Sequence, residues 1–330
     1  MYFLGIEGSA NKLGIGIVDE KGTVYANPRV TYNAPTGEGF LPSEIARHHK
    51  QNIRNVLTKA LKEAEITLTD LSAICYTRGP GVGSALSVCA MFARSLSLLL
   101  KIPLVPVNHC IAHIEMGRVV TKADNPVVLY VSGSNTQIIA FSNGYYRIFG
   151  ETIDIGIGNC LDRIARVLGI PNEPNPGYNI EQIAKNGKKY ISLPYDVYGM
   201  DMLFGNMVSR IEELKDTEKQ HNLCFSIQET LFSMLVEVTE RALAFANSDS
   251  VLLVGGVACN RRLQDMMTQM AEQRGAHVCA MDERFCIDNG AMIAYSGALH
   301  YLHGQTVEPD QADITQSFRT DQVHAVWRED

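Results

Sequence analysis

Two histidines, His109 and His113, stand four residues apart in the stretch NHCIAHIE at residues 108–115. On a helix this spacing puts both imidazoles on one face, close enough to bind one metal ion. By itself such a pair more often belongs to the core or the cap of a helix. The zinc-protease motif HExxH is absent, because Cys110 follows His109.

A metal ion would need further ligands from other parts of the chain. Two candidates stand at the ends of other expected elements: Tyr130 interrupts an apolar strand just before a turn, and Asp288 begins a helix. Each has an ordinary alternative role, as a core tyrosine and as a helix N-cap. The residues alone therefore leave a metal site open as one of two interpretations.

Turns rich in small residues follow three apolar strands, at residues 9–11, 132–136 and 255–260. Such turns expose backbone N–H groups and hydroxyls that suit phosphate oxygens. None of them has the Walker A pattern GxxxxGK[ST] or a clean GxGxxG. An ordinary tight turn explains each one singly, but three at strand ends raise the prospect of a shared nucleotide site.

The elements that would position these residues occur twice. Residues 2–31 read as three short apolar strands joined by turns, at 2–6, 14–18 and 23–30, and residues 126–149 repeat this pattern. Each meander precedes a segment of mixed helices and strands. An internal duplication of this kind predicts an α/β protein with two lobes and a cleft between them.

Apolar periodicity predicts the remaining elements. Beyond the helix that carries the two histidines, we expect helices at 42–64, 85–100, 158–168, 178–186, 225–247, 260–273 and 288–302, and strands at 73–77, 105–108 and 250–254. The last helix should return to the first lobe. The basic helix 42–64 carries His48 and His49, which we expect on its surface as a partner contact.

The composition limits the class of protein. The chain has 330 residues, 46% of them hydrophobic, which is comfortable for two domains. We find no apolar run of the roughly 18–20 residues that a membrane span requires, so no membrane partner is expected.

The eight cysteines include no CxxC pair, which is what we expect of cysteines that stay as reduced thiols. A net charge of −7 is unfavourable for gripping RNA without help.

Several blocks of the sequence resemble the tRNA threonylcarbamoyladenosine transferase family. The resemblance is to its archaeal and eukaryotic branch, whose members are the catalytic subunits of the KEOPS complex. They were once described as O-sialoglycoprotein endopeptidases. The blocks are LGIEGSANK at residues 4–12, NHCIAHIEMGR at 108–118, VSGSNTQ at 131–137, GNCLDR at 158–163, PGYNIEQIA at 176–184 and FCIDNGAMIA at 285–294. The resemblance covers nearly the whole chain, in the right order.

The resemblance implies the actin-like ATPase (ASKHA) fold, an α/β fold of two duplicated lobes around a central cleft. We expect an N-terminal lobe from residues 1–124 plus 303–330 and a C-terminal lobe from residues 125–302. The implied activity is that of an acyltransferase, which moves a threonylcarbamoyl group from threonylcarbamoyl-AMP to N6 of adenosine 37 in tRNAs that read ANN codons (t6A formation).

The resemblance also implies the site residues. One divalent metal ion per subunit, iron or zinc, would be held by His109, His113, Tyr130 and Asp288, and no catalytic residue is implied beyond this site. The substrate would be bound by Tyr130, Val131, Ser132, Gly133, Ser134, Asp162, Gly177, Glu181 and Asn260. Besides tRNA, the implied partners are a kinase-like ATPase subunit and a small dimerising subunit, in the cytoplasm and the nucleus.

The chain departs from the family pattern at a few positions. Ser134 replaces the second glycine of a turn that usually reads SGGNTQ, and Leu203–Asn206 (LFGN) replaces the usual SFSG. Ala258 replaces a glycine, and Asn11-Lys12 stands where the bacterial branch has an acidic pair. Two rival functions remain: a small-molecule kinase on the same fold, and a nucleotide-binding scaffold without transferase activity.

Overall fold

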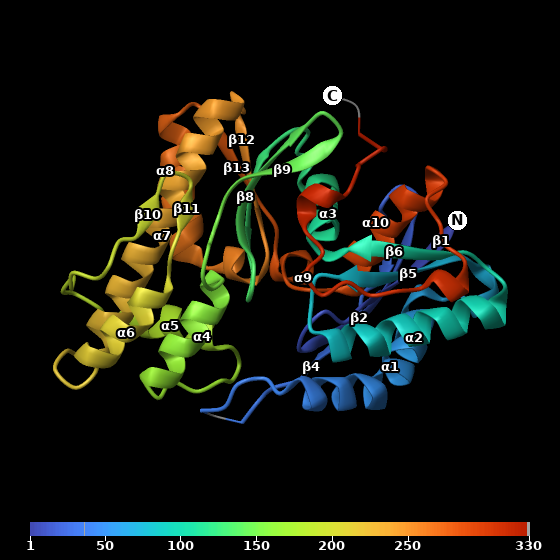
Figure 1. The fold of residues 1–330 in the computed structure, drawn as a ribbon, viewed down its shortest axis with the longest axis horizontal. Coiled ribbons are helices and arrows are strands. Elements are labelled where there is room, and N and C mark those ends of the chain that lie inside the picture. Colours follow the sequence, from blue (N-terminus) through green and yellow to red (C-terminus); the bar gives the residue numbers. More distant parts are fainter. Residues whose placement is uncertain (36, 329–330) are drawn as a thin grey trace.

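The computed structural model describes residues 1–35 and 37–328 and contains two mixed β-sheets, each with helices packed on it (Figure 1). The first sheet has the strand order β3-β2-β1-β5-β6, with β4 paired to β2, and the second has the order β13-β12-β7-β8-β9. In each sheet an antiparallel meander joins two parallel strands along the same path. The two lobes therefore share one topology, which confirms the predicted duplication.

The strands have the following bounds: β1 Tyr2–Glu7, β2 Lys12–Asp19, β3 Val24–Ala26, β4 Arg29–Thr31, β5 Leu71–Gly79, β6 Leu104–Asn108, β7 Val127–Val131, β8 Thr136–Ser142, β9 Tyr145–Glu151, β12 Ser250–Val254 and β13 His277–Ala280. A small ribbon of β10 Val197–Tyr198 and β11 Asp201–Met202 stands apart from the sheets. The single strand expected at 23–30 is wrong. Pro28, which has no N–H to donate, lies in the break between β3 and β4.

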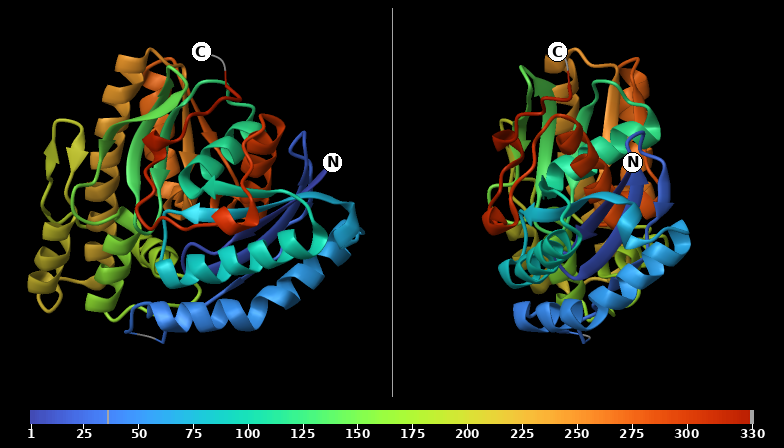
Figure 2. Two further views of the ribbon diagram at one scale, coloured as in Figure 1. Left: turned by 45° about the vertical axis from the view of Figure 1, so that its right-hand side comes forward. Right: turned by 90° about the vertical axis from the view of Figure 1, so that its right-hand side faces the viewer.

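The helices have the following bounds: α1 Pro42–Ala64, α2 Gly83–Leu100, α3 His109–Thr121, α4 Ile157–Val167, α5 Pro176–Ala184, α6 Gly205–Leu214, α7 Gln220–Ala246, α8 Arg261–Gln273, α9 Glu283–Cys286 and α10 Gly290–Leu302. Short 3-10 turns include η2 Gly256–Cys259. In Figure 2, α1 and α2 lie together beneath the first sheet. The predicted helices are confirmed within two residues at each end, except that α7 begins at Gln220 rather than at residue 225. Helices α6 and α9 were not predicted.

Helix α10 packs on β1 and β2 of the first sheet, as expected for a helix that returns to the first lobe. Two strand glycines permit this close approach. A Cβ atom on Gly5 would lie 2.2 Å from the Ala294 nitrogen, and one on Gly16 would lie 2.1 Å from the Ala291 nitrogen. The predicted boundary at residue 302 placed this helix in the second lobe, whereas its core contacts belong to the first. The lobe boundaries otherwise stay a prediction.

The chain after α10 ties the two lobes together. Val307 and Ile314 pack on the core of the first lobe, whereas Val323 and Ala325 belong to the core of the second. The segment therefore crosses from one lobe to the other (Figure 1).

Two expectations for the first lobe are corrected. His49 is fully buried, so only His48 of that pair reaches the surface of α1. Helix α2 is long and apolar enough, by length and composition, to cross a membrane, although we expected no such segment. It packs against β5 and α1 through one buried face, as the core helix of a globular lobe does.

Candidate active site and metal centre

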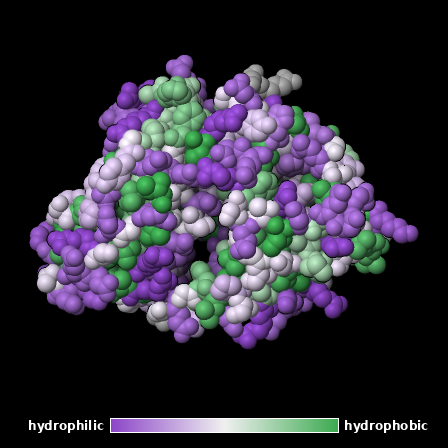
Figure 3. Space-filling model, viewed as in Figure 1, coloured by the Kyte–Doolittle hydropathy of each residue, from purple (hydrophilic) through white to green (hydrophobic). Residues whose placement is uncertain are grey.

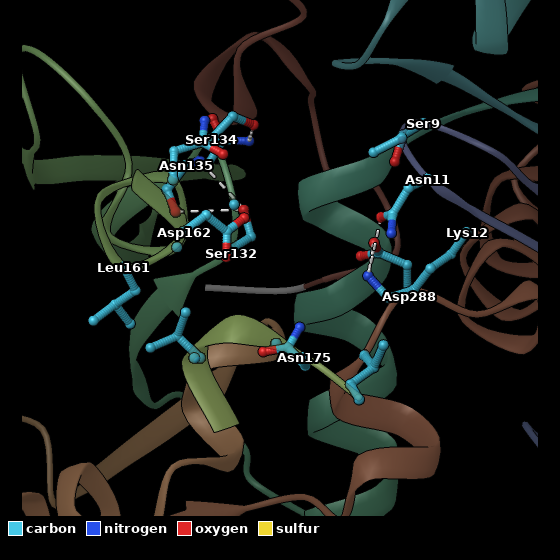
Figure 4. Close-up of a pocket in the computed structure, with 18 of the residues that line it drawn as sticks. Ser9, Asn11, Lys12, Ser132, Ser134, Asn135, Leu161, Asp162, Asn175 and Asp288 are labelled. Carbon is cyan, nitrogen blue, oxygen red and sulfur yellow. Dashed lines mark hydrogen bonds and ion pairs between the residues drawn. The ribbon is translucent and has the colours of Figure 1, made fainter. Parts of the chain in front are cut away.

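A cleft of about 1620 Å³ lies between the lobes, and both lobes contribute to its walls. Figure 3 shows the hollow between the two halves of the surface. In Figure 4, Asn11, Lys12 and Asp288 stand on one wall, while Ser132, Ser134 and Asp162 stand on the facing wall. The cleft therefore collects segments that are far apart in the sequence.

The structure brings His109, His113 and Asp288 together at one wall of this cleft. His109 and Asp288 line the cleft, whereas His113 is fully buried and lies outside its lining. The Nε2 atom of His113 lies 3.1 Å from Oδ1 of Asp288, and Nε2 of His109 lies 3.4 Å from the same oxygen. Their possible ligand atoms all lie within 4.8 Å of one another. Two imidazoles and one carboxylate at this separation form a donor set suited to zinc or iron(II).

Local sequence explains how these side chains are held. Asn108 caps α3, because its Oδ1 accepts from the backbone nitrogens of Cys110 and Ile111 at 2.9 and 3.1 Å. Asn289 caps α10 in the same way, accepting from Met292 N at 3.0 Å. The alternative role of Asp288 as the N-cap is therefore wrong, and its carboxylate is free to face the histidines.

Tyr130, at the end of β7, completes the cluster. Its ring lies 5.4 Å from that of His113, measured between centroids. Among the described residues, neither the buried Tyr130 hydroxyl nor the buried Nδ1 of His113 has a hydrogen-bond partner. Burial, with the negative charge of Asp288, holds the pKa of Tyr130 well above its ordinary value. An oxygen left without a partner beside three candidate ligands fits the fourth ligand of a metal site.

Charges around the cluster compensate one another. Burial opposes ionisation of Asp288, but Lys12 and the two histidines outweigh it and hold the pKa of Asp288 well below its usual range. The Nζ atom of Lys12 lies 3.4 Å from Oδ2 of Asp288. Burial likewise opposes protonation of His109, but Glu7 and Asp288 raise its pKa well above the ordinary value. For His113 burial dominates and lowers the pKa.

The substrate residues predicted in the second lobe form a turn against α4. The backbone nitrogen of Ser132 donates to Asn135 O at 2.8 Å, and Asn159 N donates to Gly133 O at 2.8 Å. Glycine is required next to this turn, because a Cβ on Gly158 would lie 2.7 Å from the Gly133 Cα. Gly133 and Ser134 are exposed to the cleft, where their backbone can meet a ligand.

Asp162, one turn further along α4, also lines the cleft. Burial raises its pKa to about 6, although the charges of Arg166 and Lys12 oppose this shift. No hydrogen bond to the described residues satisfies its carboxylate. A group of this kind gains from a ligand that donates hydrogen bonds, such as a ribose hydroxyl.

The remaining predicted substrate residues lie where α5 meets α8. Oε1 of Glu181 accepts from Arg261 N at 3.1 Å, and Asn260 caps α8 by accepting from Arg262 N at 2.9 Å. Gly177 lies in the first turn of α5. All three line the cleft.

Not every predicted residue reaches the cleft. The side chain of Val131 is fully buried in β7 and lies outside the cleft lining. The segment Leu203–Asn206 also lies outside it, and Asp154 holds this segment by accepting from Gly205 N at 2.6 Å. The hydroxyls missing from this segment therefore belong to a structural turn rather than to the wall of the cleft.

One residue beside the metal cluster escaped the sequence analysis. Glu7, at the end of β1, is fully buried, and its Oε2 lies 3.0 Å from Nδ1 of His109. A polar residue at the end of an otherwise apolar strand was the available signal, and the same signal drew attention to Tyr130. Residues 316–320 of the C-terminal segment also line the cleft and were missed.

Comparisons with known proteins agree with this geometry. The profile of the tRNA N6-adenosine threonylcarbamoyltransferase family matches residues 23–295. A tRNA N6-adenosine threonylcarbamoyltransferase of Xenopus laevis is 56% identical over 332 residues, covering 99% of each chain. A probable tRNA N6-adenosine threonylcarbamoyltransferase of Drosophila melanogaster is 55% identical over 344 residues, with the same coverage.

The crystal structure of T. kodakarensis HypF is similar in fold alone. The TM-score is 0.64 and the sequence identity is 16%, and the match covers 94% of this chain and 48% of that one. The expected actin-like fold is thereby confirmed.

Proposed function

Because the chain belongs to the tRNA N6-adenosine threonylcarbamoyltransferase family, which makes it an acyltransferase that forms t6A in tRNA, we propose that the cleft takes its acyl group from threonylcarbamoyl-AMP and delivers it to N6 of adenosine 37. The observation that carries this proposal is the cluster of His109, His113 and Asp288 from two distant segments, beside the turn at Ser132–Ser134.

The chemistry explains why such a site is needed. The N6 amine is a poor nucleophile, because its lone pair is delocalised into the adenine ring. The acyl donor must therefore carry a good leaving group, and AMP is one. A divalent ion held by His109, His113, Tyr130 and Asp288 would polarise the carbamoyl carbonyl and stabilise the negative charge that develops on its oxygen.

The chain's own residues bind and orient the reactants. The turn at Ser132–Ser134 offers backbone N–H groups, and Asp162 offers an acceptor for a ribose hydroxyl. Lys12 places a cation beside Asp288 on the facing wall, where it suits the phosphate of an adenylate. Holding both reactants in one cleft supplies the orientation that the transfer requires.

We propose that other subunits supply most contacts to the tRNA backbone. A net charge of −7 disfavours capture of a polyanion by this chain alone. The partners we propose are those of a KEOPS complex, a kinase-like ATPase subunit and a small dimerising subunit. The proposed location is the cytoplasm and the nucleus, with which eight unpaired cysteines in the described residues are compatible.

A reconstituted assay tests the proposal. We expect modification of adenosine 37 when the chain, its partner subunits, tRNA and threonylcarbamoyl-AMP are combined, and loss of modification in the His109→Ala variant. ATP-dependent phosphorylation of a small molecule by that variant would instead support the kinase on the same fold. Full tRNA modification by His109→Ala would contradict the proposed site.

A further inference from the structure

We propose that Glu7 is a positioning residue of the metal centre, whose carboxylate fixes the orientation and tautomer of His109. This inference rests on the proposed function, because it takes His109 as a ligand of the ion. It adds a residue that belongs to neither the metal set nor the substrate set expected from the sequence.

The two ring nitrogens of His109 face different carboxylates. Nδ1 lies 3.0 Å from Oε2 of Glu7, while Nε2 lies 3.4 Å from Oδ1 of Asp288. A carboxylate only accepts hydrogen bonds, so Nδ1 must carry the proton that it donates to Glu7. When the ring is neutral, as a metal ligand must be, its lone pair then lies on Nε2, which faces the cluster. A histidine that donates its other N–H to a carboxylate is a typical metal ligand, because the carboxylate sets the ring and raises its basicity.

Glu7 is itself held from both sides. Its Oε1 accepts from Ser9 N at 2.8 Å and from Ser9 Oγ at 2.6 Å. Its Oε2 accepts from the hydroxyl of Thr77 on β5 as well as from His109. No part of the side chain is exposed. The carboxylate therefore has a fixed place in the first sheet, and the ring of His109 takes its orientation from that sheet.

A glutamine at position 7 cannot reproduce this arrangement. Both oxygens of Glu7 are needed as acceptors, one for the Ser9 N–H and the other for the His109 ring. An amide has one oxygen, and its NH₂ group would face an N–H donor on the other side. The Glu7→Gln variant must therefore lose either the anchor on Ser9 or the bond to His109, while the shape of the side chain is preserved.

The chain offers a matched control in Glu115, a second buried carboxylate that lies on the helix of the two histidines. It is 2% exposed and accepts from Trp327 Nε1 at 2.9 Å and Arg118 Nη1 at 2.7 Å. Its partners do not include a member of the metal cluster. Glu115→Gln should therefore lower stability as a buried substitution does, without changing the affinity for metal.

The test measures the affinity for zinc and for iron(II) by competition with a chelator, together with the thermal midpoint. The proteins are the wild type, Glu7→Gln, Glu115→Gln and Thr77→Val. We expect a 10- to 100-fold loss of affinity in Glu7→Gln, a smaller loss in Thr77→Val, and wild-type affinity in Glu115→Gln. Thr77→Val keeps the charge of Glu7 and serves as the informative variant should Glu7→Gln not fold.

Two results would overturn the inference. Wild-type affinity in both Glu7→Gln and Thr77→Val would show that Glu7 does not position the ligand, while the metal centre itself stands. Equal losses in Glu7→Gln and Glu115→Gln would reduce the role of Glu7 to general stability. A wild-type protein that binds neither metal would instead contradict the proposed function, and the inference with it.

Discussion

Nε2 of His113 lies 3.1 Å from Oδ1 of Asp288, although 175 residues separate them in the chain. The contact exists because α3 and α10 pack on each other beside the first sheet, with their N-terminal ends at the cleft. Each end has an asparagine as its cap, so the histidines and the aspartate are left to face one another. The metal-site hypothesis depends on this junction, and so do the predictions that follow.

Removal of the metal should lower both activity and stability. An ion that binds only the folded protein adds about 2.7 kcal/mol to the free energy of unfolding when its free concentration is 100 times its dissociation constant. We expect treatment with a chelator to lower the thermal midpoint, and added zinc or iron(II) to restore it, as measured by calorimetry. His113→Ala should show no such response. A response of the same size in that variant would place the ion elsewhere.

Replacing His113 itself should abolish the transfer reaction. The side chain is fully buried, and its Nε2 lies 3.1 Å from Oδ1 of Asp288, so an alanine would remove one of the proposed metal ligands. We expect the rate of t6A formation in His113→Ala to fall by more than about 100-fold, beyond the 10- to 100-fold typical of residues that only support a ligand. His277→Ala on β13, which replaces an exposed histidine outside the cleft, is a suitable control and should retain the wild-type rate.

Asp162 should make stability depend on pH. Its folded-state pKa of about 6 exceeds the ordinary value of 3.8, because burial disfavours the carboxylate. Between these values the folded state keeps a proton that the unfolded state has lost, so the free energy of unfolding falls as the pH rises from about 4 to about 6. Asp162→Asn removes this loss and should stabilise the protein by about 1–2 kcal/mol at pH 7.5.

Urea denaturation at pH 7.5 and pH 5 measures this effect. The advantage of Asp162→Asn should shrink by about half at pH 5, where the wild-type carboxyl is largely protonated. The exposed Asp216→Asn is the control and should show no such difference. If Asp162→Asn is destabilised at pH 7.5, the carboxylate must have hydrogen-bond partners in the folded state.

The same variant should bind the adenylate less tightly, because it loses an acceptor in the cleft.

Restoring the family residues at Leu203 and Gly205 should have little effect on catalysis. Both lie outside the cleft, and the backbone there is held by Asp154. We expect Leu203→Ser/Gly205→Ser to change the rate of t6A formation by less than about 2-fold. The free energy of unfolding should fall, because a Cβ atom on residue 205 would lie 2.8 Å from Oδ2 of Asp154. A large gain in rate would show that this segment reaches the substrate.

Much of the fold could be predicted from the sequence, because periodicity and caps act locally. The bounds of α1 were predicted to the residue, since Pro42 opens the helix and apolar residues recur along it with helical spacing. The strand at 23–30 was not, because one proline outweighs several β-branched neighbours. The burial of His49 was also missed, since the basic residues around it masked the face that packs inward.

The site was predictable only in part. The spacing of His109 and His113 shows that they share a helix face, but it cannot show what that face meets. Asp288 and Tyr130 were candidates because they stand at the ends of expected elements, and the family resemblance joined them to the pair. The structure brings the same residues together. Glu7 lies 102 residues from its partner His109. The two meet because β1 and β6, which precedes His109, both pair with β5, and this strand order could not be read from spacing.

The most direct test of the metal centre is anomalous diffraction from crystals of the complete chain grown with zinc or iron(II). The account predicts one strong peak per chain, bounded by the Nε2 atoms of His109 and His113, the Asp288 carboxylate and the Tyr130 hydroxyl. A map without a peak at this position, or with the ion bound elsewhere and the Asp288 carboxylate turned away from the imidazoles, would contradict it.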